Sequence, residues 1–538
     1  MGPEIIDPPQ HRTALSMTPE SAFLLAACCI YAITGAIYLP QPLLDAHAFR
    51  QCQTAVTAEW LATDLNPLRM FVYETPLLGA PWRIPMEFPL FQWLVAVVHR
   101  LTGLEIDLVG RSMAMVFHLG CLWPAWAITR SLGGGFRHWA VYAGLSLLAP
   151  VYHHWSRACL IETMAVFLAM AFLATAITWL QTGKATAALA ATAAAVLAAL
   201  VKVTTFPPFA AAAVCYGIWL VISCPTHQRR QRLVRLAGLM VPYAVAIVCL
   251  GMWVQAGDAV KAEQPLSATL TSSALRSWNY GILAQRLSPQ LWRDTIAGRA
   301  IPSAGGWIGV ACVIAGLVSI RDSRRMALGF LCLAYIGSFL LFTNLHVQHN
   351  YYQVANGCML VAAIAIAACG LTAANKAGWC WGLLTALLVS CLWSFRPYAA
   401  QEWMDFSRDS RLQVAAALAQ RVPPDDVIMV AGMDWSGEIA FYARRRAIYI
   451  TSWFPHELLQ RLVDDPTCLT GGRRVGAFVF PRGARQFIRS DDVWDTRNND
   501  LLIALLARIG EDREPLEVGR FLVALGATTQ TPPRRQPQ

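Results

Sequence analysis

Several polar side chains directly follow the first apolar stretch of the chain. Asp45, His47, Arg50 and Gln51 lie within one short segment, and Glu87 follows in the same connection. A carboxylate can act as a general base, and a guanidinium matches the oxygens of a phosphate. Charged groups beside an apolar run are costly unless a polar ligand or partner contacts them, so this segment is the first candidate for chemistry.

Asp45 is the candidate general base because partial burial strengthens a carboxylate as a base. The alternative is that Asp45 caps the helix that we expect to follow it through Leu61. A cap, however, does not explain the presence of His47, Arg50 and Gln51 beside it.

Three cations are candidate ligands for a phosphate group. Arg50 and Arg157 offer guanidinium forks, and Lys202 lies near the end of an apolar run. Each of them has an alternative, which is an ordinary ion pair or a side chain that extends to lipid headgroups.

Glu162 lies in an otherwise apolar helix, five residues after Arg157. Residues three or four apart share a helix face, so this spacing separates the two side chains. Glu162 therefore needs another partner, which is a substrate hydroxyl, a metal ion or a cation on another helix. A purely structural ion pair is the alternative.

His349, Tyr351 and Tyr352 precede a late apolar run and are candidates to bind substrate. For the two tyrosines the alternative is the aromatic belt of a membrane interface. His346 and His349 have a spacing that suits a metal pair, but the nearby sequence offers no third ligand. A divalent metal stays open, without a clear ligand set.

Composition indicates a polytopic membrane protein. The 538 residues are 56% hydrophobic and only 14% charged. The formal net charge is +10, but the basic residues lie in short gaps between apolar runs, which argues against nucleic-acid binding. Most of the 15 cysteines lie inside apolar runs and form no CxxC pattern, so they act as small hydrophobic residues.

Eleven apolar runs are candidate membrane spans, each near the length of about 17 to 25 residues that a crossing needs. They cover residues 21–39, 109–130, 138–153, 158–181, 186–203, 207–224, 233–254, 304–320, 326–344, 352–371 and 377–395. The run 88–103 is shorter and carries His99 and Arg100, and we treat it as a helix in the plane of the interface.

This arrangement makes every basic gap cytoplasmic, as the positive-inside rule favours. These gaps hold Arg130 and Arg137, Lys184, Arg229 to Arg235, Arg321 to Arg325, and Lys376. We expect a multi-pass protein of the bacterial inner membrane, with a cytoplasmic segment at 1–20 retained ahead of the first span. The loops 40–108 and 255–303 and all the candidate residues then lie on the outer side.

The composition changes after the last apolar run. Residues 425–430, 447–451, 475–480 and 521–525 have the pattern of strands, with helices expected at 435–445, 455–464 and 498–509. This alternation predicts a small α/β domain over 396–527 that lies outside the cytoplasm. The Pro-rich and Arg-rich tail, 528–538, is expected to be disordered.

The residues over 21–395 resemble the GT-C glycosyltransferases that use lipid-linked sugars, above all the branch of protein O-mannosyltransferases and aminoarabinose transferases, glycosyltransferase family 39. An Asp opens the first outer loop, Ser156 and Arg157 precede an acid, and His349 with paired tyrosines precedes a late span. The chain departs from the family where Ala46 and His47 stand in place of a second acid, where Glu162 replaces the usual Asp, and where Glu87 replaces a basic residue.

The resemblance implies a GT-C fold and transfer of a sugar from a polyprenyl-phosphate carrier to an acceptor hydroxyl, with inversion. Asp45 would then be the base, while Arg50, Arg157 and Lys202 would stabilise the leaving phosphate. Glu162 and His349 would orient hydroxyl groups. The acceptor is a glycan, a lipid or a protein, and the surrounding lipids are further partners.

The helix at 88–103 and the second loop, with Trp278, Tyr280 and Trp292, are candidates to line the groove for the isoprenoid chain or to close over it. The main alternative function is a transporter or flippase of a lipid-linked sugar, which would show internal repeats and broken helices near the middle of the bilayer. A scaffold with an outer sensor domain is a third class, but it would leave Asp45 and Glu162 unexplained.

Overall fold

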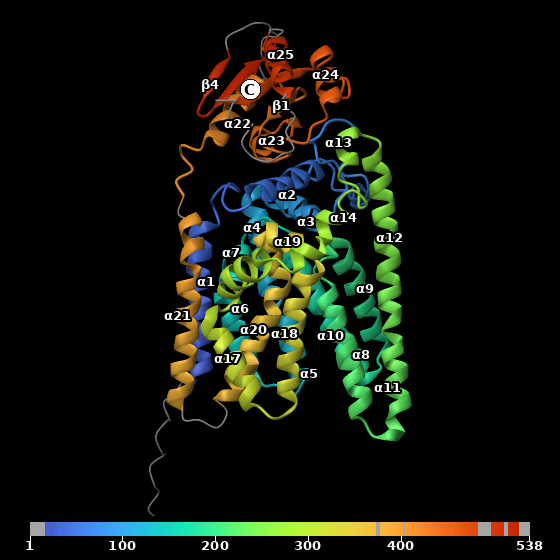
Figure 1. Ribbon diagram of the computed structural model, residues 1–538, viewed down its shortest axis with the longest axis vertical. Helices are drawn as coiled ribbons and strands as arrows, with labels where there is room; N and C mark the ends of the chain where they lie inside the picture. Colours follow the sequence, from blue (N-terminus) through green and yellow to red (C-terminus); the bar gives the residue numbers. More distant parts are fainter. Residues whose placement is uncertain (1–16, 373–376, 403, 483–496, 511–514, 527–538) are drawn as a thin grey trace, which may run out of the picture.

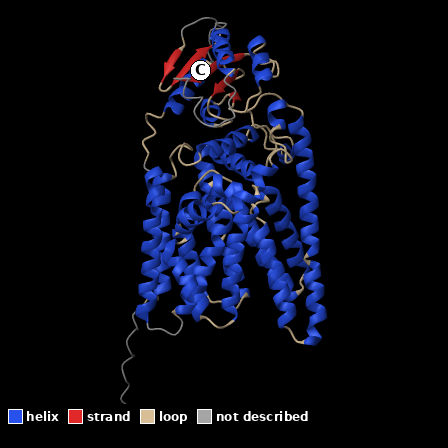
Figure 2. Ribbon diagram, in the orientation of Figure 1, coloured by secondary structure: helices blue, strands red, loops and turns tan. Residues whose placement is uncertain are grey.

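Apolar helices form one long bundle with a small sheet at one end (Figures 1 and 2). The computed structural model describes residues 17–372, 377–402, 404–482, 497–510 and 515–526. The expected tail at 528–538, most of the segment 1–20 and the Lys376 gap lie outside these residues.

The first half of the bundle carries the loop in which the polar segment lies. Its elements are α1 (Pro19–Tyr38), α2 (Ala48–Leu61), η1 (Pro67–Phe71), α3 (Leu90–Thr102), α4 (Ile106–Gly120), α5 (Leu122–Ser131), α6 (Phe136–Leu148), α7 (Pro150–Trp155), α8 (Glu162–Thr182), α9 (Ala185–Lys202), α10 (Pro207–Ser223), α11 (Thr226–Gly238) and α12 (Met240–Ala262).

The second half contains short helices and then four long ones. They are α13 (Pro265–Ala268), α14 (Arg276–Tyr280), α15 (Leu283–Arg286), η2 (Gln290–Ala300), α16 (Ile301–Ala304), α17 (Gly306–Ser319), α18 (Ser323–Leu341), α19 (Thr343–Gln348), η3 (Asn350–Gln353), α20 (Val354–Leu371) and α21 (Ala377–Glu402).

Eight helical segments in the described part are long and apolar enough to cross a membrane. They are Pro19–Tyr38, Ile106–Ser131, Glu162–Thr182, Ala185–Lys202, Thr226–Ala262, Ser323–Leu341, Asn350–Leu371 and Gly378–Gln401. A ninth arises if Gln290–Ala304 and Gly306–Ser319, which meet at 88°, form one broken span.

The remaining predicted spans correspond to shorter helices. The predicted span 138–153 is divided between α6 and α7 where Pro150 begins a new helix, and α10 has 17 residues. The number eleven therefore stays a prediction. The interfacial run at 88–103 forms α3, which has only 13 residues.

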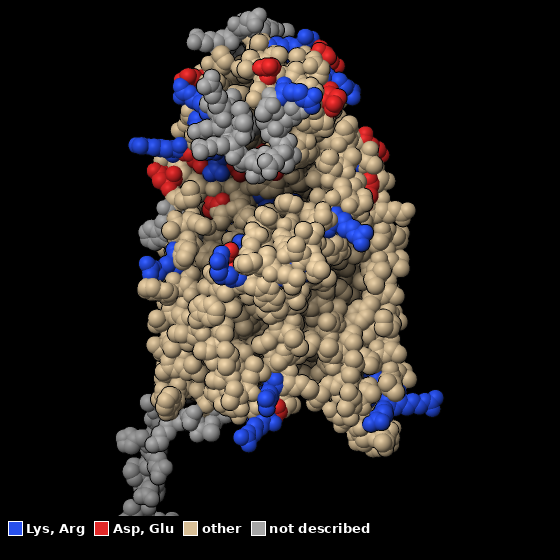
Figure 3. Space-filling model, viewed as in Figure 1, with Lys and Arg blue, Asp and Glu red and all other residues tan. Residues whose placement is uncertain are grey.

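Charge follows the long axis of the molecule. On the face drawn in Figure 3, the coloured Lys, Arg, Asp and Glu side chains lie over the half of the molecule that carries the sheet and at the opposite tip, and the band between these two regions shows none among the residues described. Figure 1 places α11, with four arginines, at the end opposite the sheet. This separation is what a bilayer around the bundle requires, and the chain is a polytopic α-helical membrane protein.

The predicted α/β unit is confirmed, with strands close to the expected positions. It contains α22 (Ser410–Arg421), β1 (Val427–Ala431), α23 (Glu438–Ala443), β2 (Arg446–Ile450), α24 (His456–Asp464), β3 (Val475–Pro481), α25 (Asn498–Gly510), β4 (Leu516–Val518) and β5 (Phe521–Leu525). Sequence patterns missed α22, which is amphipathic and charged, and the three-residue β4.

The sheet has the order β2-β1-β3-β5-β4. Strands β2, β1 and β3 are parallel and β3, β5 and β4 antiparallel. Strands β1 and β2 are buried throughout, as parallel strands covered on both faces should be. The first loop adds to the β2 edge, because Pro76 O and Leu77 O accept hydrogen bonds from Ala447 N (2.9 Å) and Tyr449 N (3.1 Å).

Candidate functional site

Asp45 is held by a buried network that joins three parts of the chain. Its Oδ1 lies 3.2 Å from Arg111 Nη2 and accepts a hydrogen bond of 2.6 Å from Gln51 Nε2. The side-chain oxygen Oε1 of Gln51 accepts a hydrogen bond of 2.9 Å from Cys159 N, and Arg111 Nη1 donates to Arg157 O at 3.3 Å. The network therefore ties Asp45 to the segment that carries Arg157.

The helix-cap interpretation of Asp45 is wrong. Helix α2 begins at Ala48 with His47 as its N-cap residue, and no side chain caps it. The Asp45 side chain is instead only 4% exposed, and its Oδ2 has no hydrogen-bond partner among the residues that the structure describes. One carboxylate oxygen is fixed by its neighbours, and the other is available to a ligand.

Sequence reasoning missed Arg111, which is fully buried and is the ion-pair partner of Asp45. It falls inside the predicted span 109–130, where it was counted as part of an apolar run. An arginine within a membrane span is itself the signal that would have found it, because such a residue needs a partner.

Glu162 and Lys202 form the second part of the site. Lys202 Nζ donates to Glu162 Oε1 from the facing helix α9, and both side chains are less than 10% exposed. Of the partners considered for Glu162, the structure therefore shows a cation on another helix, which also fits the alternative of a structural ion pair. Lys202 does not extend to headgroups, because its Nζ also lies 3.9 Å from the ring centroid of Tyr352 and 5.2 Å from that of Tyr351.

His47 connects the two parts. Its ring centroid lies 4.9 Å from that of Tyr351 and 5.5 Å from those of His349 and Trp155. Trp155 ends α7, directly before the Arg157 segment. Residues far apart in the sequence thus meet at the end of the bundle that carries the sheet (Figure 1).

Burial favours the neutral form of the His47 and His349 imidazoles. It lowers the pKa of His47, although the polar side chain of Asn350 beside it partly offsets this effect. Burial lowers the pKa of His349 to about 3, and the nearby His47, Lys202, Arg50 and Arg299 add to that shift. A neutral imidazole can donate one hydrogen bond and accept another, which suits contact with a sugar hydroxyl.

Arg50 is an ion-pair partner of Glu87. Their Nη2 and Oε2 atoms lie 2.7 Å apart, and Arg50 Nη1 also donates to Gln53 Oε1 at 2.9 Å. Gln92 Nε2 donates to the other Glu87 oxygen at 3.1 Å. Arg50 and Glu87 thus join α2 to the start of α3, and their expected contact with a substrate stays untested.

Arg157 is buried beside aromatic and imidazole groups. Its guanidinium carbon lies 4.5 Å from the ring centroid of Tyr38, and its Nη2 lies 3.5 Å from His154 Nδ1. The preceding Ser156 shares a hydrogen bond of 2.8 Å with Tyr31 in α1. The Ser-Arg segment is therefore packed into the bundle and does not form an exposed turn.

Several buried polar atoms around these residues have no partner in the described part of the chain. They are Glu162 Oε2, Trp155 Nε1, His349 Nδ1 and Asn350 Oδ1. Buried polar atoms are normally hydrogen-bonded, and exceptions require an explanation such as a ligand. Their presence in one place fits a site that binds a polar molecule.

The α/β unit holds the backbone on which Asp45 lies. Tyr442 OH accepts a hydrogen bond of 2.6 Å from Leu43 N, and Arg411 Nη2 donates to Leu44 O at 3.3 Å. Arg411 also pairs with Glu438 at 2.8 Å. No local sequence pattern indicates these contacts, because they join residues more than 360 positions apart.

Within the described residues, no group of three His, Cys, Asp or Glu side chains lies close enough to hold a metal ion. The His346 and His349 pair has no third ligand there. His346 instead packs its ring against Phe339 at 4.5 Å between centroids.

No protein-family model matches the chain, and no curated protein matches it by sequence. Several solved structures are similar to the chain in fold. ArnT from Cupriavidus metallidurans bound to undecaprenyl phosphate has a TM-score of 0.62 at 15% identity, with 96% of this chain and 100% of that chain covered. Arabinofuranosyltransferase AftD from Mycobacteria has a TM-score of 0.50 at 14% identity, covering 96% of this chain and 40% of that one. The chain has the GT-C fold, as the resemblance implied.

Proposed function

We propose that this protein is a membrane glycosyltransferase that moves a sugar from a polyprenyl-phosphate carrier to an acceptor hydroxyl, with inversion. The observation that carries the proposal is the environment of Asp45. It has one carboxylate oxygen without a protein partner in the described region, in a buried network that also holds Arg157.

The proposed step is an in-line displacement at the anomeric carbon. The acceptor hydroxyl gives its proton to Asp45 Oδ2 while its oxygen forms a bond to that carbon. The bond from the carbon to the phosphate oxygen breaks, and the polyprenyl phosphate leaves with the electron pair. Arg157 and Lys202 stabilise the leaving phosphate, because fixed cations in a dry site interact strongly with developing negative charge.

The remaining residues position the reactants. Glu162 Oε2 and His349 Nδ1 have no partners in the part described and would contact sugar hydroxyls. Tyr351 and Tyr352 pack against Lys202 and hold its ammonium group in place. Arg50 would bind phosphate only by exchanging Glu87 for phosphate oxygens, so we assign it a positioning role between α2 and α3.

The choice of donor is supported by the likeness to ArnT, whose structure contains undecaprenyl phosphate. The location is supported by the distribution of basic residues, which favours an outer position for the end that carries the sheet. The acceptor is a hydroxyl-bearing glycan, lipid or protein.

The test uses purified protein in liposomes with undecaprenyl-phosphate-linked sugars extracted from the host membrane. The wild-type protein should release undecaprenyl phosphate and glycosylate an acceptor from the same extract. Asp45→Asn should bind undecaprenyl phosphate as tightly as the wild type does. It should form undecaprenyl phosphate from the sugar donor at least about a hundredfold more slowly, because the base is lost. Equal turnover by the two proteins would rule out the assigned base.

A flippase is the rival function. Movement of the lipid-linked sugar between leaflets is followed separately, by its accessibility to an added lectin or glycosidase. Flipping by wild type and by Asp45→Asn, without any transferred sugar, would favour the rival.

A further inference from the structure

Two loops at one edge of the sheet carry partly exposed aromatic side chains. The segment 432–437 follows β1 and contacts α2, and the segment 451–455 follows β2. Figure 1 shows α23, the helix after the first of these loops, beside α2. Strand β1 lies between β2 and β3, so the parallel strands extend from it to both sides. In open α/β sheets, ligands bind outside the carboxyl ends of the strands at such a switch point.

Aromatic side chains continue from α2 onto the α/β unit. The ring of Phe49 in α2 lies 5.8 Å from that of Trp435. In the next loop, Trp453 Nε1 donates a hydrogen bond of 3.1 Å to Asp434 Oδ1. The three rings are partly exposed, and Asp434 is exposed. We call Phe49, Trp435, Trp453 and Asp434 the aromatic track, which begins four positions after Asp45 in the sequence.

Asp434 has a backbone conformation that is uncommon for a residue with a side chain. Its φ is 48°, in the left-handed region. Residues held in such regions cost free energy and are concentrated at functional sites. An ionised carboxylate accepts up to about four hydrogen bonds, and Trp453 provides one of them. Asp434 can therefore still accept hydrogen bonds from the hydroxyl groups of a ligand.

A buried hydroxyl lies in the same loop as Trp453. Thr451 directly follows β2 and is fully buried, and its Oγ1 has no hydrogen-bond partner among the residues that the structure describes. Buried polar atoms are normally paired, and an exception calls for an explanation such as a ligand. This hydroxyl is a second observation that favours a polar ligand at this edge of the sheet.

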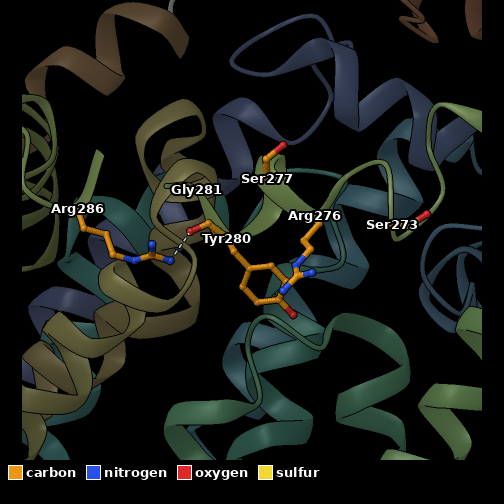
Figure 4. Close-up of a pocket in the computed structure, with 6 residues that line it drawn as sticks. All are labelled: Ser273, Arg276, Ser277, Tyr280, Gly281 and Arg286. Carbon is orange, nitrogen blue, oxygen red and sulfur yellow. Dashed lines mark hydrogen bonds between the residues drawn. The ribbon is translucent and has the colours of Figure 1, made fainter. Parts of the chain in front are cut away.

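The composition of the two loops differs from that of a phosphate site. An open cavity in the connection between α12 and η2 has Arg276 and Arg286 among the residues that line it (Figure 4). Guanidinium groups suit the oxygens of a phosphate. The segments 432–437 and 451–455 contain no Lys or Arg. The track is therefore suited to an uncharged ligand.

A sugar ring matches the groups that the track offers. It presents C–H groups on its face and hydroxyl groups at its edge. Indole rings offer broad apolar faces with a negative electrostatic surface, against which C–H groups pack. A carboxylate accepts hydrogen bonds from hydroxyl groups. An uncharged glycan uses both kinds of contact.

We propose that the aromatic track binds the glycan portion of the acceptor and directs one of its hydroxyl groups toward Asp45. Trp435 and Trp453 contact the sugar rings, and Asp434 accepts hydrogen bonds from their hydroxyl groups. The inference rests on the proposed function, and it narrows the acceptor from any hydroxyl-bearing molecule to a carbohydrate.

The first experiment measures binding without turnover, with the full-length Asp45→Asn protein in nanodiscs. The probes are oligosaccharides released by mild acid from the envelope glycans of the host, separated into uncharged and charged fractions and labelled with a fluorophore. The uncharged fraction should bind, and Trp453→Ala in the same background should weaken its binding roughly tenfold through the loss of an aromatic contact. Trp453→Phe should recover most of the affinity, because it keeps an aromatic face.

Asp434→Asn tests the carboxylate with little change in shape, since asparagine also tolerates a positive φ. It should weaken binding about fivefold, because hydrogen bonds to a charged group are stronger than those to a neutral one.

Trp379→Ala is the matched control. Trp379 is 72% exposed and lies near the start of α21, at the end of the bundle opposite the sheet (Figure 1), so glycan binding should not change. Equal loss in Trp379→Ala and Trp453→Ala would overturn the proposal.

Other binding results also contradict the proposal. Failure of the uncharged fraction to bind, or equal binding by the parent protein, Trp453→Ala and Asp434→Asn, would overturn the track as a glycan site. A mixture of envelope peptides that binds with the same dependence on Trp453 would assign the track to a protein acceptor and overturn a carbohydrate.

Transfer kinetics with Asp45 intact separate this inference from the proposed function. Trp453→Ala should raise the KM for the acceptor oligosaccharide about tenfold through the lost aromatic contact, without changing the KM for the lipid-linked donor. An equal rise in both KM values would overturn a role specific to the acceptor. Glycan binding that depends on Trp453, without any transfer by the wild type, would refute the transferase and support the track. Transfer that is insensitive to Trp453→Ala and Asp434→Asn would overturn the track alone.

Discussion

At the scale of single residues, the site is built from buried charges that stabilise one another. Asp45 is paired with Arg111, and Glu162 with Lys202, and all four side chains are less than 10% exposed. Buried charges are retained at a cost in stability, and we therefore propose that each pair has a function beyond holding the fold.

Variants of the Glu162 and Lys202 pair distinguish an effect on stability from an effect on activity. Lys202→Met should destabilise the protein by about 3 to 5 kcal/mol, because it leaves a buried carboxylate without its cation. The double variant Lys202→Met with Glu162→Gln should recover most of that loss yet remain inactive, because the phosphate ligand is still absent. The unfolding temperature and the release of undecaprenyl phosphate are measured for the wild type and for both variants. Recovered activity in the double variant would contradict the role of Lys202.

The buried histidines predict how stability depends on pH. Burial lowers the pKa of His346 and His349 to about 3, against 6.5 for an ordinary histidine. Between these values the unfolded chain binds protons that the folded protein does not, so stability falls as the pH decreases from 6.5. Each histidine contributes a slope of up to about 1.4 kcal/mol per pH unit.

Unfolding temperatures in detergent at pH 7, 6 and 5 measure this slope. His349→Gln should make it shallower, since glutamine cannot be protonated. An unchanged slope in that variant would mean that His349 is protonated in the folded protein.

At the scale of elements, α2 is held between the bundle and the α/β unit. Gln53 Nε2 donates to Trp435 O at 2.9 Å, and the ring of Phe49 meets that of Trp435 at 5.8 Å. The loop after β1 lies at the carboxyl end of the parallel strands, where such sheets often bind ligands. Here this loop contacts α2, a helix of the candidate site.

Gly437 permits that close approach. A Cβ atom there would lie 2.8 to 2.9 Å from backbone atoms of Cys52 and Gln53, which cannot move aside as a flexible side chain can. Gly437→Ala should therefore shift α2 with Gln51 and reduce kcat by at least about tenfold, in line with the cost of small misplacements at reacting groups.

Gly329→Ala is the control, because an added methyl group there meets no atom within 4 Å in the described structure. It should leave the rate unchanged. A normal rate for Gly437→Ala would mean that the contact between the α/β unit and α2 does not position the site.

Periodicity and charge predicted the helical bundle and the strands β1, β2, β3 and β5. They also predicted that Glu162 needs a partner other than Arg157, but left open whether that partner is a hydroxyl, a metal ion or a cation. They did not predict Arg111, because its partner lies 66 positions earlier, or the split at Pro150, because α6 and α7 are both apolar. Side-chain partners across distant segments depend on packing that no local pattern contains.

At the scale of the whole molecule, the proposal requires one orientation in the membrane. Cys468 lies in the α/β unit and Cys224 between α10 and α11, at opposite ends of the molecule, and both are partly exposed. A membrane-impermeant maleimide applied to intact spheroplasts should label Cys468 but not Cys224, because the proposed orientation places only Cys468 on the outer side.

Cys468→Ser removes the labelled thiol and controls for other cysteines, and detergent treatment should expose Cys224 as well. Labelling of Cys224 alone in intact spheroplasts would reverse the orientation and place the candidate site in the cytoplasm.

The central claim is that Asp45, Arg157 and Lys202 surround one phosphosugar. A cryo-electron microscopy structure with bound undecaprenyl phosphate tests it most directly. The account predicts the phosphate within about 3 Å of the Arg157 and Lys202 nitrogen atoms, a hydrogen-bond distance, with Asp45 Oδ2 facing the same space. A phosphate bound at the opposite end of the bundle, or far from all three side chains, would contradict it.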